Sequence, residues 1–224
     1  MLKAEGLSKQ FFRKGRESAR YFDAVSSCDL EISSGEVVVL SGRSGSGKST
    51  LLNMLAGLLM PTEGSVELDG RSLYELDDKA LSSLRNASFG VIPQGQTAVH
   101  SLSVIENVKL PYELYRTDDA AEEKAMTLLE EMGIANLADS FSSELSGGEL
   151  RRMAIARALM CDPAYVFADE PTADLDDENT AIVLDLLKHV AESGTSVFLV
   201  THESGAARIA DRILRMEAGN LTSA

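Results

Sequence analysis

The stretch Gly42-Arg43-Ser44-Gly45-Ser46-Gly47-Lys48-Ser49 decides the fold, because it fits the pattern GxxxxGK[ST] of loops that bind phosphate groups. It follows the apolar run 37–40 and precedes a helical pattern over 48–57, which is the position that this motif requires. Glycines let the backbone wrap around phosphates with its N–H groups pointing inward, and the helix N-terminus adds partial positive charge. The alternative interpretation is a Gly/Ser-rich turn without a ligand.

The candidate phosphate-binding residues form one continuous segment. They are Gly42, Arg43, Ser44, Gly45, Ser46, Gly47, Lys48, Ser49 and Thr50. We expect Lys48 to reach the β- and γ-phosphates of a nucleotide and to take part in catalysis, and we expect the Ser49 hydroxyl to be a ligand of magnesium.

Two acidic residues end a second apolar run. Asp169 and Glu170 follow the run 165–168, so we expect them at the carboxyl edge of the sheet, where α/β proteins bind ligands. Asp169 suits a magnesium ligand, and Glu170 is placed to orient and deprotonate an attacking water. Without a neighbouring nucleotide the same pair would be a solvated turn.

Short β-rich runs alternate with helical patterns along the chain. The runs 37–40, 165–168 and 196–200 adjoin helical patterns at 48–57 and 177–193, which predicts βαβ units and an α/β fold with a mostly parallel sheet. In the second helix we expect Asp176 to be the N-cap. The expected apolar face of that helix is Ile182, Val183, Leu186, Leu187 and Val190.

The segment between these units reads as mostly helical. Candidate helices cover 104–110, 118–132 and 147–159, with little clustering of β-branched residues. We therefore predict a single domain over 1–224, in which 1–94 and 160–224 form an α/β core and 95–159 form an inserted helical subdomain.

Composition excludes several classes of protein. The formal net charge of -14 repels nucleic-acid phosphates and anionic lipid headgroups, so membrane association is expected to run through another protein. No apolar stretch reaches the length needed to span a bilayer, and the N-terminus lacks the apolar core of a signal peptide. Cys28 and Cys161 have no metal-binding spacing, and we expect both to be buried.

The segment Leu145-Ser146-Gly147-Gly148-Glu149 narrows the class. Ser146 and Glu149 form an S-x-x-E capping box, so the segment has a structural interpretation as a helix start. However, two glycines are poor helix formers, and exposed N–H groups at a helix N-terminus bind phosphate. The chain here resembles the ATP-binding cassette (ABC) ATPases, whose signature segment reads LSGGQ or LSGGE.

The resemblance extends in the family's order along almost the whole chain, and it assigns further residues. It implies that Phe11 stacks on adenine, with Phe12 and Tyr21 as rivals, and that Gln94 links the active site to the transport domains, with a part in catalysis and metal binding. It implies that Asp174 and Asp176 belong to the loop after the catalytic glutamate, and that His202 contacts the γ-phosphate. Candidate nucleotide contacts from a second copy are Ser146, Gly147, Gly148 and Glu149.

The resemblance also implies a fold, cofactors and partners. The fold would be a RecA-like P-loop NTPase core with an N-terminal antiparallel β region, and the cofactors would be ATP and Mg2+. The partners would be an integral membrane permease and, in the ATP-bound state, a second copy packed head to tail. The chain would lie in the cytoplasm, on the inner face of the cell membrane.

Within the family, the chain is most similar to the subfamily of lipoprotein-release and macrolide-efflux exporters. The extended N-terminal loop, the 103–110 segment and the compact length carry that similarity. Departures from the common pattern are Pro93 in place of an aromatic residue, an apolar-poor segment at 95–100, Ala173 in place of glycine, and Leu150-Arg151-Arg152 where Gln-Gln-Arg is frequent. These departures concern coupling to the membrane partner more than hydrolysis.

Other functions remain open from the sequence. The chain could be an ATP-driven regulatory switch on a membrane partner, as in cell-division relatives, without transporting a substrate. A non-hydrolysing nucleotide-binding module is less compatible with Lys48, Glu170 and His202. A soluble cassette of DNA repair or translation is disfavoured because there is no coiled-coil insertion, second cassette or basic patch.

Overall fold

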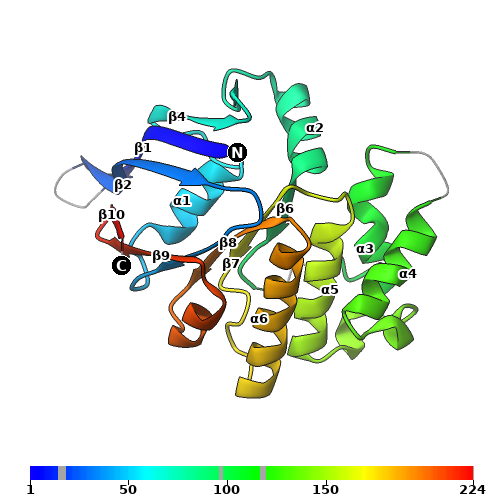
Figure 1. Cartoon of the computed structure of the whole chain (residues 1–224). Helices are drawn as coiled ribbons and strands as arrows, with labels where there is room; N and C mark the ends of the chain where they lie inside the picture. The colour runs from blue at the N-terminus through cyan, green and yellow to red at the C-terminus, as the bar shows by residue number, and fades with distance from the viewer. Residues whose placement is uncertain (15–18, 96–97, 117–119, 224) are drawn as a thin grey trace.

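The computed structural model describes residues 1–14, 19–95, 98–116 and 120–223 (Figure 1). Its helices are α1 (Lys48–Leu55), α2 (Asp78–Ser88), α3 (Val104–Glu113), α4 (Ala121–Glu131), α5 (Gly147–Leu159) and α6 (Asp177–Glu192). One sheet contains β1 (Leu2–Lys14), β2 (Ala19–Ile32), β4 (Glu63–Leu68) and β5 (Arg71–Ser72). The other contains β3 (Val37–Ser41), β6 (Phe89–Ile92), β7 (Tyr165–Asp169), β8 (Ser196–Thr201), β9 (Arg212–Glu217) and β10 (Asn220–Ser223).

The larger sheet is mostly parallel, as the sequence predicted. Its strand order is β10-β9-β3-β8-β7-β6, and only β10 is antiparallel to its neighbour. The smaller sheet has the order β2-β1-β4-β5 and is antiparallel throughout, which confirms the predicted N-terminal antiparallel region. Figure 1 shows this smaller sheet and α1 on one side of the larger sheet, and α3 to α6 on the other.

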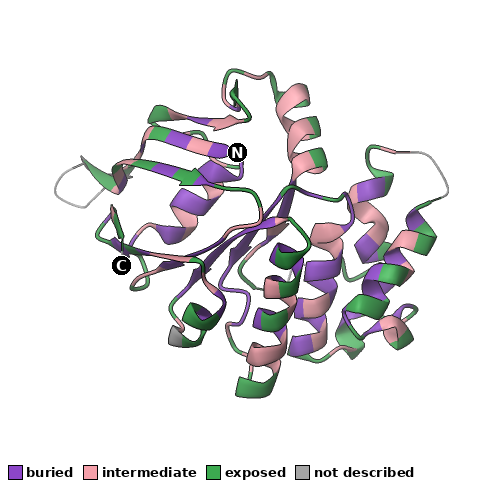
Figure 2. Ribbon diagram, in the orientation of Figure 1, coloured by how far each residue is buried: buried purple, intermediate pink, exposed green. Residues whose placement is uncertain are grey.

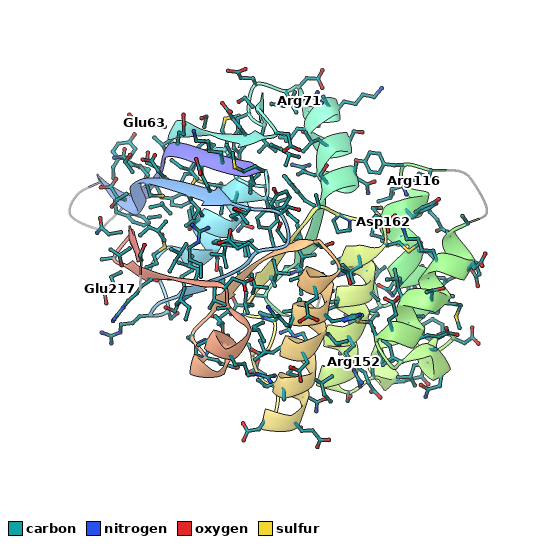
Figure 3. The ribbon with its side chains drawn as sticks, viewed as in Figure 1. Glu63, Arg71, Arg116, Arg152, Asp162 and Glu217 are labelled. Carbon is teal, nitrogen blue, oxygen red and sulfur yellow. The ribbon has the colours of Figure 1, made fainter. Side chains whose placement is uncertain are left out.

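The larger sheet is buried on both faces, because alternate residues of its strands enter two different apolar clusters. Val37 and Val39 of β3 pack among α3 to α6, whereas Val38 and Leu40 pack among α1 and the smaller sheet. Figure 2 shows these central strands as an almost continuous buried band. Charged side chains such as Glu63, Arg71 and Glu217 lie at the outer rim in Figure 3.

Helices α3, α4 and α5 pack against one another, and they share one apolar cluster with the larger sheet and α6. α5 also contacts β6 closely, since a Cβ added at Gly90 would lie 2.5 Å from the carbonyl oxygen of Ala158. α3 runs three residues past its predicted end at Leu110, through Pro111 to Glu113. The predicted start of the next helix at 118 lies outside the described residues, and the division into 1–94 plus 160–224 and 95–159 stays a prediction.

Two sequence expectations need correction, and one helix was missed. Helix α2, which Asp77 caps by accepting a hydrogen bond from the Ala80 N–H (2.7 Å), was not predicted. The buried face of α6 is rotated, because Leu184 and Ala191 are buried whereas Ile182 and Leu186 are only partly so. Cys161 is buried as expected, but Cys28 lies on β2 and is half-buried.

Candidate active site

The candidate active site lies where three neighbouring parallel strands end. β3, β8 and β7 are adjacent in the larger sheet, and the register pairs Ser41 with Thr201 and Val200 with Asp169. The glycine-rich loop follows β3, Glu170 follows β7, and His202 follows β8. The fold therefore gathers at one edge residues that are far apart in the sequence, as the strand-end argument predicted.

The loop between β3 and α1 needs glycine for steric reasons. Gly47 has φ +108°, and a Cβ there would lie 2.0 Å from the carbonyl oxygen of Ala24 on β2. Only a residue without a side chain can make this approach. The Ser46 N–H donates to the Arg43 carbonyl (3.2 Å), whereas the Arg43 and Ser44 side chains stand at the exposed tip of the loop.

The charged side chain of Lys48, at the start of α1, is buried. Its side chain is only 6% exposed, and its Nζ donates to the carbonyl oxygens of Gly42 (2.9 Å) and Arg43 (3.2 Å). The same Nζ lies 3.8 Å from Oε1 of Glu170. These three oxygens replace part of the hydration that the ammonium group has lost.

Glu170 connects this lysine to His202. Its Oε2 accepts a hydrogen bond from the His202 backbone N–H (3.3 Å) and lies 2.9 Å from His202 Nδ1. Glu170 has φ +48°, a left-handed conformation that costs free energy in a residue other than glycine, and its N–H donates to the Val200 carbonyl (2.8 Å). The strained backbone aims a buried carboxylate along the edge of the sheet, toward an exposed histidine.

Asp169 and Ser49 fit a magnesium site. Burial raises the pKa of Asp169, and hydrogen bonding by the neighbouring Ser49 side chain opposes the rise. Asp169 Oδ1 is buried and has no hydrogen-bond partner among the described residues, which suits a cation ligand. The described residues contain no group of three or more His, Cys, Asp or Glu side chains that could by itself hold a metal ion. Magnesium needs few protein ligands when phosphates and water supply the others.

An aromatic pair borders the loop. A pocket of about 370 Å3 is lined by the loop and α1 residues 45–50 together with Phe11, Phe22, Asp23, Ala24, Ala218 and Gly219. Phe11 and Phe22 are paired across β1 and β2 with ring centroids 6.0 Å apart, whereas Phe12 and Tyr21 form their own pair next to them. Because successive residues of a strand face opposite ways, the rivals Phe12 and Tyr21 point away from the pocket.

The sequence did not single out Phe22 or Gly219. The Gly219 N–H donates to the Ser46 carbonyl (2.9 Å), and the Gly219 carbonyl accepts from the Ser26 N–H (2.8 Å), so the β9–β10 turn closes the pocket. Cross-strand pairing opposite Phe11 was a signal that would have identified Phe22, but no pattern in the sequence brings the β9–β10 turn to this loop.

The signature segment is not part of this pocket. Ser146 is the N-cap of α5: its Oγ accepts from the Glu149 N–H (3.4 Å), and Glu149 Oε2 accepts from the Ser146 N–H (2.7 Å), as the capping box predicted. In Figure 1 the start of α5 lies well away from the start of α1. Gly148 has a packing role of its own, because a Cβ there would lie 2.2 Å from Oδ1 of Asn179 on α6.

Two further predicted residues lie outside the pocket around Lys48. Asp174 is exposed, has φ +65°, and lines a small cavity together with Gly147 and Gly95. Gln94 follows β6 at the same sheet edge, is exposed, and forms no side-chain hydrogen bond with another described residue. Asp176 is the N-cap of α6, as predicted, and accepts from the Asn179 N–H (2.8 Å).

Comparison with known proteins agrees with this geometry. The ABC transporter family matches residues 25–173. The lipoprotein-releasing system ATP-binding protein LolD of Pseudomonas syringae pv. tomato is 42% identical over 226 residues, covering 100% of this chain and 98% of the relative. LolD of Chromohalobacter salexigens is 39% identical over 224 residues, covering 99% and 93%.

Solved structures also match over the whole length of the chain. The dimeric post-hydrolysis structure of the ATP-binding cassette MJ0796, bound to ADP and Pi, superposes with a TM-score of 0.90 at 33% identity, covering 100% of this chain and 98% of that one. A nucleotide-free cassette superposes with a TM-score of 0.82 at 23% identity, which bears on the fold alone. The predicted P-loop NTPase fold is therefore confirmed.

Replacing Asp169 by asparagine is expected to stabilise the chain in buffer without nucleotide or metal. Burial raises the pKa of Asp169 above its ordinary 3.8, so the unfolded chain loses this proton at a lower pH than the folded chain does. The free energy of unfolding therefore falls as the pH rises from the pKa of Asp169 in the unfolded chain through its pKa in the folded chain. Asparagine does not ionise, so the variant does not show this fall. Urea unfolding from about pH 4 to pH 8 should show the advantage of Asp169→Asn growing with pH. A difference in the free energy of unfolding that stays constant over this pH range would contradict the raised pKa of Asp169.

Proposed function

Because this chain belongs to the ABC transporter family and is an ATP-hydrolysing subunit of a membrane transporter, we propose that it powers a lipoprotein-releasing exporter as one half of an ATP-bridged dimer. One observation is the main support for the proposed dimer. The loop around Lys48 and the signature segment 145–149 are separate in a single chain, although each has the N–H groups that bind phosphate. A second copy packed head to tail would bring the two segments to one triphosphate.

In this proposal the loop residues 42–50 hold the phosphates. The Lys48 ammonium exchanges the Gly42 and Arg43 carbonyls for β- and γ-phosphate oxygens, which carry more negative charge. The adenine stacks on Phe11, and Phe22 belongs to the same aromatic surface. Ser146, Gly147, Gly148 and Glu149 of one copy, with Asp174 beside them, complete the site of the other copy.

Hydrolysis would be carried out by Glu170 and His202. The Glu170 carboxylate takes the proton of the attacking water, and the contact with His202 Nδ1 fixes the direction in which it points. His202, exposed beside it, donates to the γ-phosphate. Magnesium held by Ser49 and Asp169, with Gln94 as a third candidate ligand, would neutralise charge that develops on the phosphates.

The relatives of this chain support a membrane partner and a lipoprotein substrate. The two LolD proteins are components of lipoprotein-releasing systems and match essentially the whole chain. We place the chain at the cytoplasmic face of the membrane, bound to a permease that contains the substrate path. Among the described residues, no helix combines the length and apolar character needed to cross a bilayer. The alternative is a regulatory switch on a membrane partner without transport.

Glu170→Gln is expected to bind ATP, form a stable dimer and stop turnover, because the amide cannot accept the proton of water. Gel filtration with ATP and Mg2+ checks the dimer, and steady-state phosphate release checks turnover. Lys48→Ala is the matched control, since without the ammonium it should bind ATP weakly and stay monomeric. A Glu170→Gln protein that remains monomeric with ATP would contradict the dimer for the isolated subunit.

The aromatic assignment predicts a contrast between two neighbouring pairs. Phe11→Ala and Phe22→Ala should each weaken ATP binding about tenfold, as expected for the loss of a ring that stacks on a base. Tyr21→Ala and Phe12→Ala should leave the Kd for ATP within about twofold, because these rings face away from the pocket. Calorimetric titration measures all four, and equal losses for Tyr21→Ala and Phe22→Ala would reject the assignment.

Transport can be separated from regulation by reconstitution. The chain, together with the membrane protein that copurifies with it, is expected to release a lipid-anchored protein from vesicles when ATP is added. The same complex with Glu170→Gln should release none, because binding without hydrolysis cannot complete the cycle. ATP hydrolysis by the wild-type complex without release of lipoprotein would favour the regulatory alternative.

A further inference from the structure

The loop that carries Gln94 has little structure of its own. Pro93 lacks an N–H group, and Gly95 has φ +86°, with no atom of the described residues beyond its chain neighbours within 4 Å of an added Cβ. No backbone–backbone hydrogen bond joins residues 93–95 to another described residue outside the strands. An anchor for the backbone around Gln94 must therefore come from a side chain.

Arg151 on the first turns of α5 supplies that constraint. Its Nη1 donates to the Gly95 carbonyl (2.8 Å) and lies 3.4 Å from the Pro93 carbonyl, so one nitrogen binds carbonyl oxygens of the two residues on either side of Gln94. The Arg151 side chain is buried, with 8% of the residue exposed. A buried guanidinium donating to carbonyls makes stronger and more directional contacts than an exposed one.

Arg151 also faces the loop that follows Glu170. Gly95, Gly147, Arg151 and Asp174 line one cavity of about 130 Å3. Burial lowers the pKa of Arg151, and the negative charge of Asp174 opposes that change. One side chain of the signature helix therefore contacts the Gln94 loop and borders the same cavity as Asp174.

The far end of the same loop is fixed independently. Asn107 of α3 is fully buried, and its amide accepts from the Val99 N–H (2.7 Å) and donates to the carbonyls of Val99 and Leu102 (both 3.1 Å). The loop is thus held at 99–102 by α3 and at 93–95 by Arg151. Removing Arg151 would free only the end that carries Gln94.

Two departures from the common family sequence meet in this contact. Arg151 stands where glutamine is frequent, and Pro93 stands where an aromatic residue is common. The contact with Pro93 is made through its backbone carbonyl. The two departures from the common sequence therefore lie in direct contact with each other.

We propose that Arg151 is a positioning residue for ATP hydrolysis, which holds the carbonyls of Pro93 and Gly95 on either side of Gln94 and so sets where the Gln94 amide meets the metal and the attacking water. The proposal rests on the proposed function of Gln94. Arg151 acts through that loop and does not line the pocket around Lys48.

The test is steady-state phosphate release by the full chain carrying Arg151→Met, which keeps an apolar stem and removes the guanidinium. We expect kcat about tenfold lower, the effect of losing a hydrogen bond from a charged donor, with KM for ATP within about twofold. Arg151→Lys should recover most of the rate, because one nitrogen makes both contacts. Arg85→Ala is the matched control: Arg85 donates to the Gly57 carbonyl (2.8 Å) between α2 and the end of α1, and its loss should leave kcat unchanged.

A double-mutant cycle with Gln94→Ala identifies the path of the effect. If Arg151 acts through Gln94, Arg151→Met should cost little further rate in the Gln94→Ala background. If the double variant lost rate by the product of the two single factors, the proposal would be overturned. An Arg151→Met protein with the kcat of the wild type would overturn it as well. If Arg151→Met melts below the assay temperature, Arg151→Gln replaces it with a residue frequent at this position in the family and is expected to show the same loss.

The outcomes also separate this proposal from the proposed function. A wild-type kcat for Arg151→Met, with low kcat for Gln94→Ala and Glu170→Gln, would reject Arg151 alone. A Gln94→Ala protein as fast as the wild type would reject the role of Gln94 and, with it, that of Arg151. Phosphate release by Glu170→Gln at the wild-type rate would reject the assigned catalytic base and leave the Arg151 comparison interpretable.

Discussion

The buried charge of Lys48 is the interaction on which the rest of the site depends. An ammonium group that is almost completely removed from water is stable only if oxygens replace its hydration, and Gly42, Arg43 and Glu170 provide them. The residue before Lys48, Gly47, passes against the backbone of β2, where a side chain would not fit. The glycine pattern, the lysine and the glutamate on a different strand therefore form a single electrostatic unit.

This unit also explains why the site is open to a more negative ligand. Carbonyl oxygens and one carboxylate at 3.8 Å satisfy the lysine only in part, and a triphosphate would interact more strongly with it. The strained backbone of Glu170 lies next to it, as does Asp169 Oδ1, which has no hydrogen-bond partner in the described part of the chain. Groups that are poorly satisfied in the protein itself thus surround the place proposed for the phosphates and the metal.

The second half of the proposed site is rigid for different reasons. Gly148 is required by the packing of α5 against Asn179 of α6, whether or not a nucleotide is present. The same close approach places the capped start of α5 beside the loop containing Asp174, and Arg151 extends this arrangement to the Gln94 loop. A signature that is read as a nucleotide contact therefore also has a structural function, and both functions require the same small residue.

The sequence alone determined the features that depend on local pattern. These are the phosphate loop between a strand and a helix, the carboxylates at the end of β7, the caps at Ser146 and Asp176, and the mostly parallel sheet. Backbone conformation and hydrophobic period are properties of a short segment, so they can be read from it. Tertiary structure alone decided which of four aromatic residues face the pocket, that Cys28 is half-buried, how α6 is rotated, and that Arg151 binds the loop around Gln94. Each of these depends on strand register or on packing between segments distant in the sequence, and no local pattern specifies which side chains such packing brings together.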